Sequence, residues 1–177
     1  DKESSESAIA VDGGFVTMDS GLVIYDEQLT KINELISRLL KESDAKCALL
    51  VNRDGRTVAK QGFTRTMDTD QLGALVAGSF SATSRVAALL GEPEFTVMFH
   101  QGKHDHIHIA LVDEKTLLVV TFDERTTVGM VRLVAKAVGE NLAGVLTEVY
   151  QNPATDQELG SADEIAEGFD DILGASE

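Results

Sequence analysis

The spacing of hydrophobic residues along the chain predicts the order of its helices and strands. From Tyr25 to Ser43, apolar residues recur three and four positions apart, which is typical of an amphipathic helix. The apolar run from Ala45 to Asn52, a turn that contains Gly55, and a second run from Thr57 to Gly62 together predict a β-hairpin.

A second helix is predicted over residues 69–90, because Asp68 and Gln71 form a plausible start, and Gly91 and Pro93 end the pattern. Strand-like runs that read as a meander follow at residues 95–101, 107–112 and 116–123. A third helix is predicted from Val131 to Tyr150, where apolar residues again recur every three or four positions.

Two predicted strands, Ala48–Val51 and Leu117–Phe122, are apolar on consecutive residues, which indicates a sheet covered on both faces. The element order α-β-β-α-β-β-β-α then predicts a three-layer α/β/α sandwich around a five-stranded, mainly antiparallel sheet. The first and third helices cover one face, and the helix at 69–90 lies alone on the other.

The helix at 69–90 has almost no polar face. A projection at ~100° per residue assigns these residues to the sheet: Leu72, Leu75, Val76, Phe80, Thr83, Val86, Ala87 and Leu90. The opposite side consists of small residues and one charge: Ala74, Ala77, Gly78, Ser81, Ser84, Arg85 and Ala88. Because a helix that is apolar or small all round is normally covered, we expect a second copy or a partner to bind that side.

Two alternatives to a partner-binding side remain open. The acidic N-terminal segment could fold over it, although that segment has few apolar residues. The alanines could also reflect helix propensity alone, but Gly73 and Gly78 argue against this because each costs ~1 kcal/mol relative to alanine in a helix interior.

The net charge of -15 lies mainly at the two ends of the chain. We expect a disordered acidic segment at residues 1–21, a domain at 22–151 and an acidic tail at 152–177. Because the domain is nearly neutral, nucleic acid and anionic membranes are not expected partners. No uninterrupted apolar run approaches the ~20 residues of a membrane span, and Cys47 is the single cysteine, so we expect a cytoplasmic protein.

The C-terminal tail contains one amphipathic pattern, at residues 162–173. Its apolar positions have helical spacing and are Ile165, Phe169, Ile172 and Leu173. A short helix of this kind typically becomes ordered in a groove of a partner. Packing on the chain's own body, or disorder, is an equally good interpretation.

No catalytic set, cofactor motif or nucleotide-binding loop is found. The run His104, His106 and His108, with His100 nearby, could supply zinc ligands. Alternation with apolar residues equally describes a half-solvated strand, which we favour. We therefore expect neither a metal nor a cofactor.

Several strings, in this order and spacing, resemble the roadblock/light-chain-7 family. They are Leu22-Val23-Ile24-Tyr25, Leu75-Val76-Ala77-Gly78, Leu90-Gly91-Glu92, Phe99-His100-Gln101-Gly102 and the segment from Phe122 to Gly129. The resemblance covers about residues 22–151. Within the family it is closest to the bacterial regulators that act on a Ras-like GTPase of cell polarity and motility.

The resemblance implies a homodimer with a continuous sheet, in which the two 69–90 helices lie side by side and receive one small Ras-like GTPase. Such regulators stimulate GTP hydrolysis without an arginine finger, are not enzymes in their own right, and can act at a cell pole. Their C-terminal segment assists nucleotide exchange. Arg85 departs from the family's small-residue pattern. The alternative is a non-catalytic roadblock scaffold within a larger assembly linked to a GTPase.

Overall fold

The computed structural model describes residues 15–17 and 23–151, and the chain divides into two compact units. The larger unit comprises residues 27–147 and the smaller comprises residues 1–26 with 148–177. The predicted helix at 162–173 lies outside the described residues.

The elements in chain order are β1 (Phe15–Thr17), β2 (Val23–Tyr25), α1 (Asp26–Ser43), β3 (Cys47–Asn52), β4 (Thr57–Gly62), α2 (Thr69–Leu89), β5 (Val97–Gln101), β6 (His106–Asp113), β7 (Thr116–Phe122) and α3 (Val128–Gln151). The larger unit contains a five-stranded sheet in the order β4-β3-β7-β6-β5, and every neighbouring pair is antiparallel. The predicted fold class is therefore confirmed, and the helix and strand ends differ from prediction by only a few residues.

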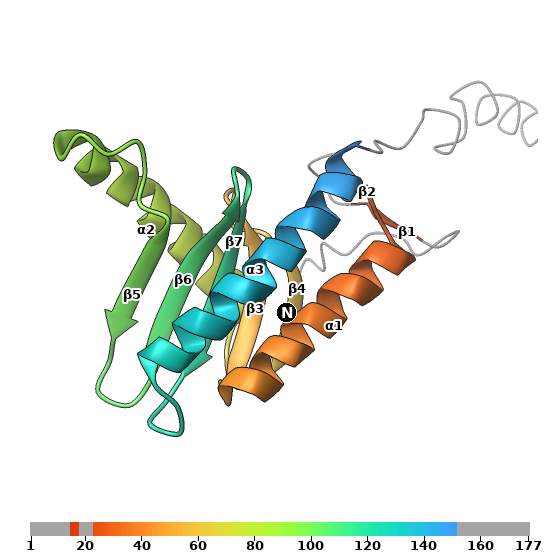
Figure 1. Cartoon of the computed structure of the whole chain (residues 1–177), viewed down its shortest axis with the longest axis horizontal. Helices are drawn as coiled ribbons and strands as arrows, with labels where there is room; N and C mark the ends of the chain where they lie inside the picture. Colours follow the sequence, from red (N-terminus) through yellow and green to blue (C-terminus); the bar gives the residue numbers. More distant parts are fainter. Residues whose placement is uncertain (1–14, 18–22, 152–177) are drawn as a thin grey trace, which may run out of the picture. The chain divides into compact units, whose positions relative to one another are not determined.

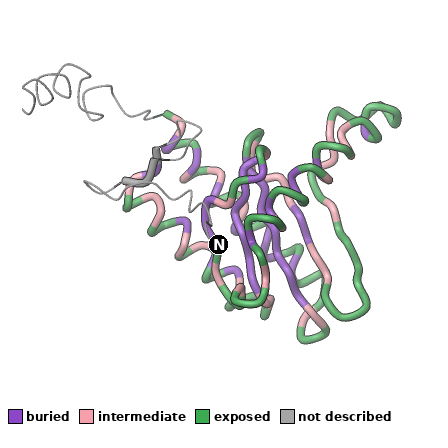
Figure 2. Tube along the Cα trace, turned by 180° about the vertical axis from the view of Figure 1, so that it is seen from behind, coloured by how far each residue is buried: buried purple, intermediate pink, exposed green. Residues whose placement is uncertain are grey.

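The sheet is covered on both faces. Figure 1 shows α1 and α3 on one face and α2 on the other. All residues of β3 and β7, the two inner strands that the sequence marked as continuously apolar, are buried. Figure 2 shows the same buried strands from behind, with exposed segments around them.

Alternation along the strands divides the core between the two faces. The face toward α2 holds a cluster in which the strand residues Cys47, Leu49, Val51, Ile109, Leu117 and Val119 meet Val76, Ala77 and Phe80 of α2. The intervening residues, such as Leu50 and Val120, point to the opposite face, which α1 and α3 cover.

Strand β1 corrects the prediction for the N-terminal segment. Phe15–Thr17 had been assigned to a disordered stretch, but it pairs antiparallel with Val23–Tyr25. Three residues are too few to produce a recognisable period in the sequence, and such a short strand is defined by its pairing.

Helix α2 is long and apolar enough, by length and composition, to cross a membrane. The sequence predicted no apolar stretch of that length, because serine, threonine and charged residues interrupt the apolar pattern of α2. One side of α2 packs on the sheet through buried residues that include Val76 and Phe80, but only 28% of its apolar window is buried in the described chain.

His108 lies on the sheet face opposite α2 and is 2% exposed. Burial, and secondarily the charge of Arg132 on α3, lowers the pKa of His108 below its usual 6.5. The neutral imidazole is therefore favoured in the folded chain, whereas the unfolded chain binds a proton near the ordinary pKa.

We predict that His108 makes the fold less stable as pH falls below about 6.5, because the unfolded chain then binds more protons than the folded chain. Urea unfolding of wild type and His108→Gln at pH 7.5 and pH 5.5 tests this. The loss of unfolding free energy between the two pH values should be smaller in the variant. Equal losses would contradict the prediction.

Candidate partner-binding site on helix α2

Both ends of α2 are defined by local hydrogen bonds. The carboxylate of Asp68 accepts a hydrogen bond of 2.9 Å from the backbone N–H of Gln71, as the capping pattern predicted. At the other end, the Leu90 N–H donates to Ala87 O, and Gly91 adopts a φ of +79°.

The side of α2 that packs on the sheet differs from the projected side. Its buried residues are Thr69, Gly73, Val76, Ala77, Phe80 and Ala87. Leu75, Val86 and Leu90, which the projection assigned to the sheet, are 66%, 50% and 70% exposed. Ala77, which the projection assigned to the free side, is only 4% exposed, so that assignment was wrong.

A close backbone approach explains this rotation of the helix. Gly73 packs on the β3–β4 turn so tightly that a Cβ atom there would lie 2.9 Å from the carbonyl oxygen of Gly55. A Cβ atom at Gly55, whose φ is +95°, would lie 2.8 Å from the Cα atom of Ala74 in the helix. The side of α2 that carries Gly73 therefore packs on the sheet, because only a residue without a side chain fits at this contact. The projection had instead assigned the largest apolar side chains to the sheet.

The rotation places an apolar row on the solvent side of α2. We call Leu75, Ala82, Val86 and Leu89 the outer stripe. These residues are spaced seven, four and three positions apart, which keeps them on one side of a helix. All four are exposed, Leu89 to 87%. None of the four was a predicted site residue, because Leu75 and Val86 were assigned to the sheet and Ala82 and Leu89 to neither side. The excess of apolar residues over one sheet-facing stripe was a signal for them.

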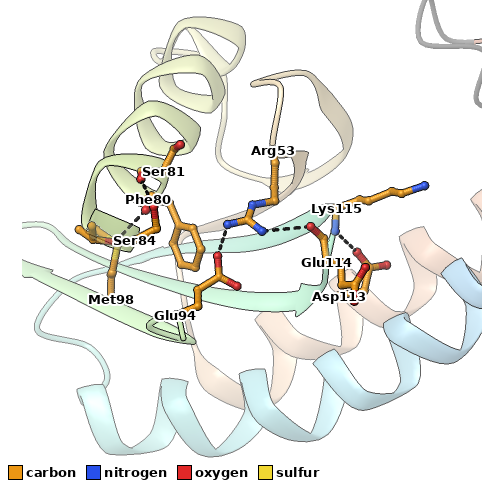
Figure 3. Close-up of polar contacts among 10 residues, drawn as sticks. Arg53, Phe80, Ser81, Ser84, Glu94, Met98, Asp113, Glu114 and Lys115 are labelled. Atoms are coloured by element: carbon orange, nitrogen blue, oxygen red, sulfur yellow. Dashed lines mark hydrogen bonds and ion pairs between the residues drawn. The ribbon is translucent and has the colours of Figure 1, made fainter. Parts of the chain in front are cut away.

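The other predicted residues lie beside the outer stripe. Ala74, Gly78, Ser81, Arg85 and Ala88 are exposed, as expected for a free side. Ser84 is half-buried, and its hydroxyl donates a hydrogen bond of 2.7 Å to Ser81 O (Figure 3). Their role in binding a partner stays a prediction.

Gly78 has no packing role within the described part of the chain, because a Cβ atom there would meet nothing within 4 Å. The same holds for Gly144 on α3, so open space alone does not define a site. At Gly78, however, the open space lies among small residues next to the outer stripe, where a missing side chain allows another backbone to approach.

Strand β5 forms one edge of the sheet and contacts the C-terminal half of α2. It is the last strand in the sheet order, paired with β6 along one edge. Met98 packs toward α2, where its sulfur lies 3.6 Å from the Thr83 hydroxyl, while Val97 and Phe99 are about two-fifths exposed, at 39% and 40%. An exposed edge strand can pair with another chain.

Cys47, His106 and His108 have packing roles, whereas His100 and His104 are exposed. Cys47 is buried, its sulfur lies 2.9 Å from the Thr121 hydroxyl, and burial raises the pKa of its thiol, which opposes nucleophilic chemistry. His106 packs on the ring of Phe122, and His108 is buried, so the half-solvated interpretation of this strand was wrong for His108. Among the described residues, no group of three or more His, Cys, Asp or Glu side chains could hold a metal.

Comparison with known proteins identifies the class to which this fold and surface belong. Residues 31–122 match the Roadblock/LC7 domain, and the chain belongs to that family. An uncharacterised protein of Methanocaldococcus jannaschii is 26% identical over 111 residues, which cover 63% of this chain and 96% of that relative.

Solved structures of MglB proteins narrow the comparison. Myxococcus xanthus MglB is 38% identical with a TM-score of 0.68, over 72% of this chain and 96% of that one. A gliding protein MglB from Thermus thermophilus is 32% identical with a TM-score of 0.64, over 78% and 99%. An MglB with a tetrameric arrangement is 34% identical with a TM-score of 0.70, over 72% and 96%. The chain is therefore a roadblock protein that is similar to MglB.

The two glycines of α2 give a paired prediction. At concentrations at which the chain is monomeric, Gly78→Ala should raise the free energy of unfolding by about 0.5–1 kcal/mol, because alanine is the better helix former and the single chain has room for its methyl. Gly73→Ala should lower it by about 1–3 kcal/mol, because the added methyl meets backbone and forces a shift. Urea unfolding measures both, with Gly144→Ala as the matched control on α3. Stabilisation by Gly73→Ala would contradict the proposed role of the close approach.

Proposed function

We propose that this chain forms a homodimer that binds a small Ras-like GTPase of the MglA type and stimulates its GTP hydrolysis. The observation that carries the proposal is the uncovered side of α2, with its outer stripe and the small residues beside it. Membership of the roadblock family and similarity to MglB support this interpretation.

The outer stripe supports dimerisation. A row of exposed apolar side chains on one helix is costly in water, and burial stabilises by roughly 25 cal/mol per Å² of apolar area. A second α2 lying alongside would cover Leu75, Val86 and Leu89, and Gly78 would allow the helices to approach closely. Edge-to-edge pairing of β5 would extend the sheet across the same two-fold axis.

The paired helices would present their small residues together to the GTPase. Ala74, Ser81 and Ala88 leave a shallow, nearly uncharged surface that a larger partner can contact closely. Arg85 is the one cation among them. In this proposal the dimer repositions the GTPase's own catalytic groups, and Arg85 binds the partner as a surface contact.

Two further parts of the proposal come from the resemblance to such regulators. The C-terminal segment with Ile165 and Phe169, outside the described residues, assists nucleotide exchange. The protein acts in the cytoplasm, enriched at a cell pole.

We expect Leu75→Glu to weaken dimerisation at least roughly tenfold, equivalent to about 1.4 kcal/mol, because it places a charge on the apolar row. Leu133→Glu on α3 is the matched control, since Leu75 and Leu133 are 66% and 67% exposed and both changes add one negative charge. Sedimentation equilibrium measures the dissociation constant. Equal effects of the two substitutions would show that the outer stripe is not part of the dimer interface.

Arg85→Ala tests the mechanism of stimulation. An arginine finger contributes about 10³–10⁵ in turnover, whereas a surface contact changes mainly the affinity. We expect Arg85→Ala to raise the concentration needed for half-maximal stimulation and to lower the maximal rate less than about tenfold. Single-turnover GTP hydrolysis at saturating regulator separates the two effects.

The same assay tests the function as a whole. GTP hydrolysis by an MglA-type GTPase that does not change at saturating wild-type protein would contradict stimulation. Binding in both nucleotide states without a change in rate would instead indicate the scaffold alternative.

A further inference from the structure

One arginine joins three segments at the end of the sheet where β5 begins. Arg53 lies in the β3–β4 turn, and its backbone N–H donates a hydrogen bond of 2.8 Å to Lys115 O. Its guanidinium donates through Nη1 to Glu114 O at 3.1 Å and through Nη2 to the carboxylate of Glu94 (Figure 3). Its Cζ lies 5.5 Å from the centroid of the Phe80 ring.

The contacts of Arg53 with Glu94 and Phe80 are partly withdrawn from water, whereas its hydrogen bond to Glu114 O is exposed. The side chain of Arg53 is 33% exposed and that of Glu94 is 25% exposed. Phe80, the aromatic residue of α2 that is buried against the sheet, is 1% exposed. An ion pair in this environment is screened less than a surface pair, and a planar guanidinium can bind a carboxylate and an aromatic ring at once.

Glu94 lies in the middle of the connection between α2 and β5. The start of this connection is held by the bond from Glu92 N–H to Ala87 O, and its end by the bond from Leu111 N–H to Thr96 O. Arg53 therefore links α2, through Phe80, to the segment that leads into β5. We call the contacts of Arg53 with Phe80, Glu94 and Glu114 the Arg53 clamp.

We infer that Arg53 is a positioning residue that sets the placement of β5 relative to α2. The outer side of α2 and the edge of β5 can then contact the second copy of the chain at the same time. This inference rests on the proposed homodimer. A two-fold interface that pairs α2 with α2 and β5 with β5 requires a fixed placement of α2 relative to β5 in each copy. A preformed arrangement avoids the cost of ordering them at association.

The test compares Arg53→Gln with wild type in two measurements. Hydrogen exchange at concentrations below the dimer dissociation constant should be faster at the backbone amides of residues 94–99 in the variant, because the connection loses its anchor. Dimerisation should weaken roughly tenfold while the variant stays folded at 25 °C. Arg53→Lys keeps the charge but not the planar fork, and should restore only part of the affinity.

Two comparisons separate positioning from general stability. Glu94→Gln should weaken dimerisation. The double variant with Arg53→Gln should dimerise no more weakly than the single variant with the larger effect, because both changes break the same set of contacts. Arg38→Gln, which breaks an exposed pair with Glu42 on α1, is the control and should leave both measurements unchanged.

The possible results separate a positioning role of Arg53 from a purely structural one. A lower urea midpoint for Arg53→Gln with unchanged exchange at residues 94–99 and unchanged dimerisation would make Arg53 merely structural and overturn the inference. Additive effects of the Arg53 and Glu94 changes would overturn the clamp as a unit. A wild-type chain that is monomeric at every concentration would refute the homodimer, whereas faster exchange in Arg53→Gln would still show the link between α2 and β5.

Discussion

The burial of β3 and β7 on both faces is the constraint on which the rest of the domain depends. Every residue of these two strands is withdrawn from water, so helices must cover both sides of the sheet. With α1 and α3 on one face, α2 covers the other. The described chain has no further layer over α2, and for this reason its outer side is a surface.

The composition of that surface follows from one close contact. Gly73 of α2 and Gly55 of the β3–β4 turn approach so closely that neither position has room for a side chain. This contact sets the rotation of the helix about its axis. The rotation buries Ala77 and exposes Leu75, Val86 and Leu89, which form an apolar row on the solvent side. A small internal contact therefore determines which residues a partner would meet.

Family membership and surface chemistry answer different questions. One fold can carry different activities, so membership of the roadblock family does not by itself assign one. The proposed GTPase regulation depends on the uncovered side of α2 and on its relation to β5. Arg53 connects these two elements through Phe80 and Glu94, and so links the interior of the domain to the surface on which its function would depend.

By itself, the sequence determined the element order, the two-sided sheet and the unusual lack of a polar face on α2, because these depend on local periodicity and on runs of apolar residues. It also identified most of the exposed small residues on that helix. Tertiary structure alone decided the rotation of α2, the burial of Ala77 and His108, the pairing of β1 and the contacts of Arg53. These depend on contacts between residues far apart in the chain, and their energies are not encoded in any local pattern.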